Sequence, residues 1–331
     1  MMRKIWQENP AQFEFPSEPA VTVELLNLLA ETIYFWLMIE HPLPDTDAWV
    51  LFYTQANLPV LRHTLHALEK LREHAETVNG RVLSSVILQD PLMTLRVLAY
   101  LEENRPKKQH TDITTIERAL MMIGLDPFFS KFQNLPLVED QLKPYPKAQL
   151  GLLKSIRRAR KATHWAREWA IWRHDLDVDE ITVATLLHDI TEMLMWCFAP
   201  NLQLRVQEML AQNPGLRTTT AQQEIYGIRL IDLQLALVNA WHLPKLLATL
   251  INAIPQDGAE AAGELIGPDN PRVKNVFLAV DLARHSANGW HDAALPDDFK
   301  GIEDLLHISH EALLHKLGLD AEDKAEQNQP Q

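Results

Sequence analysis

Apolar residues recur mostly at spacings of three and four residues along this 331-residue chain, and only 11 of its residues are glycine. This spacing places apolar side chains on one face of an α-helix, whereas strands alternate every second residue. Hydrophobic residues make up 47% of the chain and charged residues 23%, which suits a globular protein with a large buried core. We therefore predict an all-α fold.

The composition also narrows the environment and the partners. A single cysteine, Cys197, excludes an internal disulfide and favours a reducing compartment. Residues 1–6 are followed by Gln, Glu, Asn and Pro rather than by the apolar core of a signal peptide. The most apolar stretch, residues 34–39, is far too short to span a bilayer. We expect a cytoplasmic protein without a membrane span, and the net charge of −13 argues against broad nucleic-acid binding.

Prolines and capping residues divide the chain into predicted segments. Asp90-Pro91 marks the start of one helix, because Asp90 can accept backbone N–H bonds and Pro91 fits the first helical position. Thr114 and Glu117 have the spacing of a capping box. The predicted segments are an N-terminal helical extension at 1–57 with a helix at 21–40, a domain at 58–290 (lobe one 58–133, connector 134–147, second lobe 148–290), a C-terminal segment at 291–319 with one helix at 302–317, and a disordered tail at 320–331.

Two histidines and two aspartates form the most informative pattern for function. His164, the adjacent pair His188-Asp189, and Asp281 fall on successive predicted helices. Imidazole and carboxylate groups are ligands for a divalent transition metal such as iron or manganese, and an incomplete protein shell leaves positions open for catalysis. The alternative is that the His-Asp pair and Asp281 form a buried hydrogen-bond network that joins helices.

The same residues resemble a known family. The order His, His-Asp, Asp is similar to the metal ligands of the HD superfamily of phosphohydrolases, and the surrounding segments resemble its HDOD branch over about residues 58–285. The segments that carry this resemblance are Ile87 to Leu98 around Asp-Pro, Ile116 to Gly124, Leu186-Leu187-His188-Asp189-Ile190, and Trp241-His242-Leu243-Pro244. The resemblance implies a two-lobed helical bundle with a regulatory rather than hydrolytic role.

Some family features are absent from this sequence. Glu102-Glu103 stand where the family often has Asn-Ser, Leu230 stands in place of a common histidine, and Ile254-Pro255 stand where paired histidines often occur. These differences argue against a dinuclear metal site. Glu192 lies three residues after the His-Asp pair, and by resemblance to active HD hydrolases it is the candidate general acid or orienter of the attacking water.

A basic cluster accompanies His164. Arg160 and Lys161 precede this histidine by four and three residues, and Arg167 follows it by three, so all three are expected near its face of the helix. Such a cluster could bind a phosphate-bearing small ligand. Alternatively, these side chains face water or pair with the carboxylates of Asp175, Asp177, Asp179 and Glu180.

Two functions therefore follow from the sequence. The first is a non-catalytic HDOD signalling module that acts through a protein partner or a small regulatory ligand, with a vestigial or structural metal site. The second is a metal-dependent phosphohydrolase acting on a nucleotide or another phosphomonoester, in which His164, His188, Asp189 and Asp281 hold one divalent metal and Glu192 assists proton transfer.

Overall fold

The computed structural model describes residues 38–74, 78–105, 112–251 and 270–319. Nearly all of the expected helix at 21–40 and the whole of the expected tail at 320–331 lie outside these residues. Within them every named element is a helix, and Val60 and Leu137 form an isolated β-bridge. The all-α prediction is confirmed.

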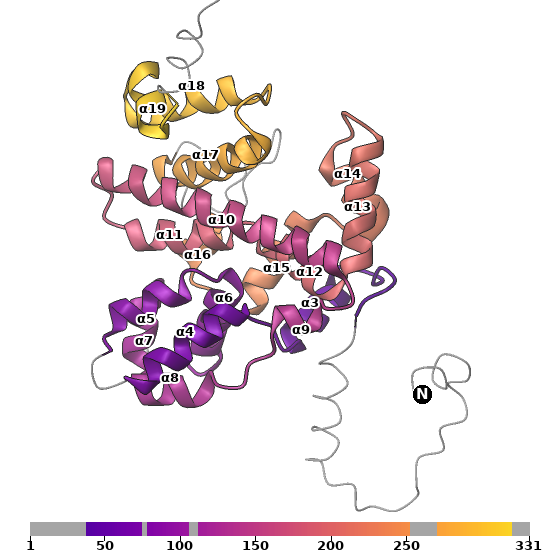
Figure 1. The fold of residues 1–331 in the computed structure, drawn as a ribbon, viewed down its shortest axis with the longest axis vertical. Coiled ribbons are helices and arrows are strands. Elements are labelled where there is room, and N and C mark those ends of the chain that lie inside the picture. The colour runs from indigo at the N-terminus through magenta and orange to yellow at the C-terminus, as the bar shows by residue number, and fades with distance from the viewer. Residues whose placement is uncertain (1–37, 75–77, 106–111, 252–269, 320–331) are drawn as a thin grey trace, which may run out of the picture. The chain divides into compact units, whose positions relative to one another are not determined.

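The first part of the described chain forms a group of short helices. α5 packs against α4 and α7, and α6 also packs against α7. Figure 1 shows α4 to α8 gathered together, whereas α3 lies apart from them and packs against the later helix α15 (Leu230–Ala240). The bounds in this part of the chain are α3 Thr46–Gln55, α4 Arg62–Glu73, α5 Gly80–Ile87, α6 Pro91–Glu103, α7 Ile116–Ile123, α8 Leu125–Lys131 and α9 Val138–Gln141.

The second part is organised around one long helix, α10. This helix packs against α11, α12, α13 and α17, and α17 in turn carries α18 (Figure 1). The bounds are α10 Pro146–Trp172, α11 Val178–Leu187, α12 Ile190–Phe198, α13 Pro200–Gln212, α14 Thr218–Tyr226, α15 Leu230–Ala240, α16 Lys245–Ile251, α17 Pro271–His285, the 3₁₀ turn η3 Ser286–Asn288, α18 Leu295–Leu306 and α19 His310–Leu317.

Two predicted helix starts have different outcomes. Asp90 caps α6 as predicted, because its carboxylate accepts hydrogen bonds from the backbone N–H groups of Leu92 and Met93 at 3.0 and 3.2 Å. The capping box at Thr114 is wrong by one residue. Thr115 is the N-cap of α7 and accepts a bond from the N–H of Arg118, three positions later. The Thr114 hydroxyl instead donates to a carboxylate of α11.

The single C-terminal helix predicted at 302–317 is also wrong. The structure has two helices, α18 and α19, separated at His307, whose φ of +54° ends α18 in the left-handed region. Ser309 then starts α19 by accepting a hydrogen bond from the N–H of Ala312. A local cap in the sequence His-Ile-Ser therefore overrides the continuous apolar spacing.

The described residues include one stretch long and apolar enough to cross a membrane, residues 178–198. It consists of α11 and α12, and the backbone leaves the helical conformation between the two, at Asp189, where φ is −100° and ψ is 28°. Within it, 89% of the most apolar window is buried inside the fold. Core packing against α10 and α16 accounts for its apolar composition.

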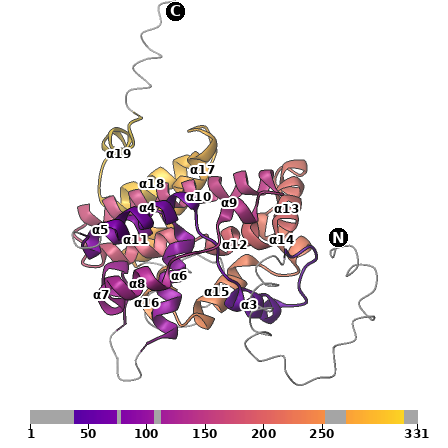
Figure 2. The same ribbon diagram turned by 60° about the horizontal axis from the view of Figure 1, so that its bottom comes forward.

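The two groups of helices share one buried core and several polar contacts. α6 packs against α11, which Figure 2 shows from a second direction. The Thr114 hydroxyl donates to Glu180 of α11 at 2.7 Å, and the Gln141 side chain donates to the carbonyl oxygen of Cys197 at 2.7 Å in the interior. These contacts hold α11 and α12 against the first group of helices.

Candidate functional site

The His-Asp pair lies between two helices. His188 follows the last residue of α11, and Asp189 precedes the first residue of α12. Adjacent side chains within a helix point about 100° apart. At this junction the backbone turns, and Nδ1 of His188 lies 3.0 Å from Oδ1 of Asp189. Both side chains are largely buried.

An arginine that the sequence reasoning did not single out joins this pair. Arg158 of α10 places Nη2 3.2 Å from Oδ2 of Asp189 and 2.6 Å from Oε2 of Glu192. The other oxygen of Glu192 accepts hydrogen bonds from the Ser155 hydroxyl at 2.7 Å and from the indole N–H of Trp196 at 3.3 Å. Glu192, the candidate proton donor of the sequence analysis, is thus held by three donors.

A second arginine connects Asp281 to the same cluster. Arg284, one turn after Asp281 on α17, places Nη1 3.1 Å from Oδ1 of Asp281. Its Nη2 lies 3.5 Å from Oδ1 of Asp189. We call His188, Asp189, Glu192, Asp281, Arg158 and Arg284 the arginine–carboxylate cluster. It joins α10, α12 and α17.

The charges of this cluster compensate one another. Burial acts to raise the pKa of Asp189, but Arg284, His188 and Arg158 together outweigh it and lower the pKa of this carboxyl. Burial likewise acts to lower the pKa of Arg158, and Glu192 and Asp189 outweigh it and raise that pKa. For Asp281, burial dominates and raises the pKa, against the opposing effect of Arg284. Asp189 is therefore ionised, with its charge balanced by arginine.

These residues do not fit a divalent metal. Within the described ranges, no three His, Cys, Asp or Glu side chains are grouped so that they could hold one. The guanidinium of Arg158 already binds Asp189 and Glu192. A divalent cation about 4 Å from a guanidinium would be repelled by about 8 kcal/mol at an effective dielectric constant of about 20. One observation points the other way, since Nε2 of His188 is buried without a hydrogen-bond partner.

His164 does not lie with the other three predicted ligands. Arg158, Ala159 and Ala162 line the small space beside His188 and Asp189, so this face of α10 meets the His-Asp pair. His164 is two positions after Ala162, about 200° around the helix. It is exposed and lines a different pocket. In the sequence, the alanines at 159 and 162 are three residues apart and mark one face of this helix. That spacing was the signal that could have pointed to Arg158.

The predicted basic cluster is divided between two places. Arg160 and Arg167 line the same pocket as His164, whereas Lys161 does not. The ammonium group of Lys161 lies 4.7 Å and 4.9 Å from the ring centres of Trp165 and Trp290, in cation–π geometry. One part of the alternative interpretation is confirmed, because Arg167 forms an ion pair with Asp179 at 3.0 Å.

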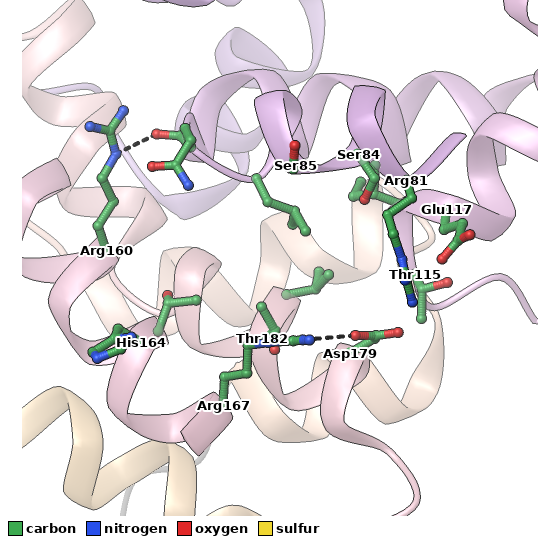
Figure 3. Close-up of a pocket in the computed structure, with 15 residues that line it drawn as sticks. Arg81, Ser84, Ser85, Thr115, Glu117, Arg160, His164, Arg167, Asp179 and Thr182 are labelled. Carbon is green, nitrogen blue, oxygen red and sulfur yellow. Dashed lines mark hydrogen bonds and ion pairs between the residues drawn. The ribbon is translucent and has the colours of Figure 1, made fainter. Parts of the chain in front are cut away.

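The pocket beside His164 lies between the two groups of helices. It has a volume of about 500 Å³, and we call it the inter-lobe pocket. Figure 3 shows Arg81 and Ser84 entering from α5, Thr115 and Glu117 from α7, and Arg160, His164 and Arg167 from α10, with Asp179 and Thr182 from α11. Its apolar lining consists of Leu88, Ile116 and Val183. It is separate from the arginine–carboxylate cluster.

Comparison with known proteins gives one family and several similar structures. Residues 58–256 match the HDOD domain family. The response regulator MmoQ from Methylococcus capsulatus superposes with a TM-score of 0.58 at 17% identity, covering 79% of this chain and 98% of MmoQ. A virulence factor from Campylobacter jejuni gives 0.56 at 19% identity, covering 84% and 93% of the two chains.

An HDOD domain protein from Geobacter sulfurreducens gives a TM-score of 0.42 at 18% identity, with 83% and 96% of the chains covered. No curated protein matches the chain significantly. At these identities, the superpositions on MmoQ and the virulence factor describe a shared fold.

Proposed function

Because the chain belongs to the HDOD domain family, we propose that it is a regulatory signal-transduction module that neither hydrolyses a phosphoester nor binds a catalytic metal. The observation that carries this proposal is the position of Arg158, whose guanidinium binds the carboxylates of both Asp189 and Glu192. Those are the groups that a hydrolase would need for its metal and for proton transfer.

The cluster then has a structural role in the regulator. Arg158 and Arg284 supply the positive charge that a metal would otherwise supply to Asp189. The first belongs to α10, the second to α17, and Asp189 precedes α12. Three helices are thereby fixed by ion pairs, two of which are largely buried.

We infer that such a module acts in the cytoplasm by contacting a protein partner in a signalling pathway or by binding a small regulatory ligand. Met121 and Met122 of α7 support a protein contact, because their side chains are 71% and 49% exposed. Adjacent exposed methionines give an adaptable apolar surface. The name response regulator that MmoQ carries belongs to the same class of function.

A metal-dependent phosphohydrolase is the second candidate, and one observation favours it. Nε2 of His188 is buried and unpaired, as expected of a nitrogen that points toward a missing ligand. For this function a metal such as manganese or iron would have to displace Arg158 from Asp189 and Glu192. Glu192 would then be free to act as a general acid.

Metal content distinguishes the two candidates. The protein, purified without chelator or metal affinity, is incubated with Mn²⁺ or Fe²⁺, desalted and measured by plasma mass spectrometry. Asp189→Asn tests the cluster, and Asp232→Asn is the control, because Asp232 lies on α15 in an exposed ion pair with Arg229. We expect far less than one metal ion per chain in all three proteins, and no hydrolysis of p-nitrophenyl phosphate.

One metal ion per chain in the wild type and in Asp232→Asn, lost in Asp189→Asn, would overturn the proposal. Metal-dependent phosphatase activity with the same dependence on Asp189 would establish the hydrolase.

A further inference from the structure

The inter-lobe pocket collects positive charge in an otherwise acidic chain. Its lining includes Arg81, Arg160 and Arg167, against the carboxylates of Glu117 and Asp179. Three arginines and two carboxylates give the pocket a net charge of +1 with His164 neutral (3 − 2), whereas the whole chain carries −13. The formal charge of the pocket lining therefore differs in sign from that of the chain as a whole.

The arginines differ in how far they are already used. Arg160 donates to the backbone oxygen of Gln89, and its Nη2 lies 3.1 Å from Nε2 of His63. Arg167 is paired with Asp179 (Figure 3). Arg81 makes no side-chain hydrogen bond or ion pair with any residue that the structure describes. Its guanidinium is thus available for bidentate contact with an anion.

Other donors surround the same space. The hydroxyl of Ser84 and the imidazole of His164 line it, as does the first turn of α7. The N–H groups of Ile116 and Glu117 belong to that first turn, where a helix has no internal acceptors for them. Guanidinium, hydroxyl and helix N-terminal N–H groups around one pocket are the donor set that proteins use for phosphate.

We propose that the inter-lobe pocket binds a small organic phosphate of about mononucleotide size. The volume of about 500 Å³ suits such a ligand, and Leu88, Ile116 and Val183 provide an apolar surface for its organic part. The phosphate contacts Arg81 and Ser84 from the first group of helices and His164 from α10. Binding therefore links the two groups of helices. This inference rests on the proposed regulatory function, for which the ligand would be the input signal.

Ligand binding is measured on the full chain by calorimetry and by the melting temperature. The probes are inorganic phosphate, pyrophosphate, adenosine monophosphate and guanosine monophosphate, with adenosine and guanosine as uncharged controls. We expect at least one phosphate-bearing probe to raise Tm by a few degrees at millimolar concentration, and neither nucleoside to do so.

Substitutions locate the site. Arg81→Ala and His164→Ala remove exposed side chains, one from each wall of the pocket. Arg81→Ala should raise the dissociation constant of the phosphate-bearing probe about tenfold or more, and His164→Ala should raise it by less. Arg118→Ala is the matched control, because Arg118 is an exposed arginine of α7 outside the pocket. It should leave the dissociation constant unchanged.

Three results would overturn the proposal: no response to any phosphate-bearing probe, equal weakening by Arg81→Ala and Arg118→Ala, or loss of binding in Asp189→Asn with binding intact in Arg81→Ala. The last result would place the ligand at the arginine–carboxylate cluster. The metal measurement does not depend on these probes. A failure of the phosphate proposal, seen as no binding of any probe, is therefore distinguished from a failure of the proposed function, seen as one bound metal ion per chain.

Discussion

At the scale of single residues, Arg158 decides how the His-Asp site is interpreted. A metal site and an arginine ion pair use the same carboxylates, and both solve the problem of an ionised aspartate in a buried position. In this chain the guanidinium of Arg158 lies against Asp189 and Glu192, with its side chain 18% exposed. In this chain the guanidinium of Arg158 thus supplies positive charge next to the His-Asp pair.

Removing Arg158 should therefore destabilise the fold strongly. In Arg158→Ala, Glu192 loses its cation and Asp189 keeps only the longer contact with Arg284, which we expect to lower the free energy of unfolding by about 3 kcal/mol. Arg167→Ala is the control, because Arg167 and Asp179 are 48% and 59% exposed and solvent screens their ion pair. Its effect should stay below about 1 kcal/mol. Urea denaturation followed by circular dichroism measures both, and equal effects would contradict the role given to Arg158.

Sequence reasoning identified part of this cluster. His188 and Asp189 lie together where predicted, and Asp281 reaches them through Arg284. Arg158 was missed because residue type, rather than helical face, guided the choice of His164. A search for metal ligands considers histidines and carboxylates, so it cannot find an arginine that takes the place of the metal ion. The 3.6-residue period of the helix, applied to the buried alanines of α10, points instead to position 158.

At the scale of elements, the contact between α10 and α12 depends on one glycine. A Cβ atom built on Gly151 would lie 2.5 Å from ring atoms of Trp196, well inside van der Waals contact. The indole is 4% exposed and also donates to Glu192, so it cannot easily move. Glycine at this position therefore sets how closely the two helices approach.

Gly151→Ala should destabilise the protein by about 1 to 3 kcal/mol through overpacking. This is opposite to the usual gain of about 0.5 to 1 kcal/mol for alanine in a helix interior. Gly80→Ala is the control, because a Cβ there would meet its nearest neighbour, Cγ of Glu117, at 3.9 Å. It should change stability by less than about 0.5 kcal/mol. A neutral or stabilising Gly151→Ala in urea denaturation would show that the two helices are not so closely packed.

The element boundaries show what the sequence can and cannot provide. Helix type followed from apolar spacing, and the α6 start followed from Asp90-Pro91, because both signals are local. The α7 start shifted to Thr115 because Thr114 bonds to Glu180, a residue far away in sequence. The break between α18 and α19 at His307 came from a backbone conformation that non-glycine residues adopt only rarely. The pattern of apolar and capping residues in the sequence gives no information on long-range hydrogen-bond partners or on left-handed backbone conformations, and these determined the helix bounds that were predicted wrongly.

At the scale of the whole described chain, the two groups of helices share one hydrophobic core. Buried residues of both groups belong to the same cluster, from Leu95 of α6 to Leu187 of α11. Contacts between the groups include the bond from Thr114 to Glu180 and the buried bond from Gln141 to Cys197. Such continuity favours unfolding in one transition, and it also lets a ligand in the inter-lobe pocket influence both groups.

The distribution of tryptophan allows a test of whether the two groups of helices unfold in one transition. Residues 58–133 contain no tryptophan, so tryptophan fluorescence reports on the rest of the chain, whereas far-ultraviolet circular dichroism reports on all helices. Leu95 is fully buried in α6, and Leu95→Ala should cost about 2 to 5 kcal/mol through the cavity that it leaves. If the core is shared, the fluorescence transition in urea shifts by the same amount as the dichroism transition. A dichroism transition that moves while the fluorescence transition stays in place would show that residues 58–133 unfold independently, and a phosphate ligand would then have to stabilise the contact between two separately folded parts.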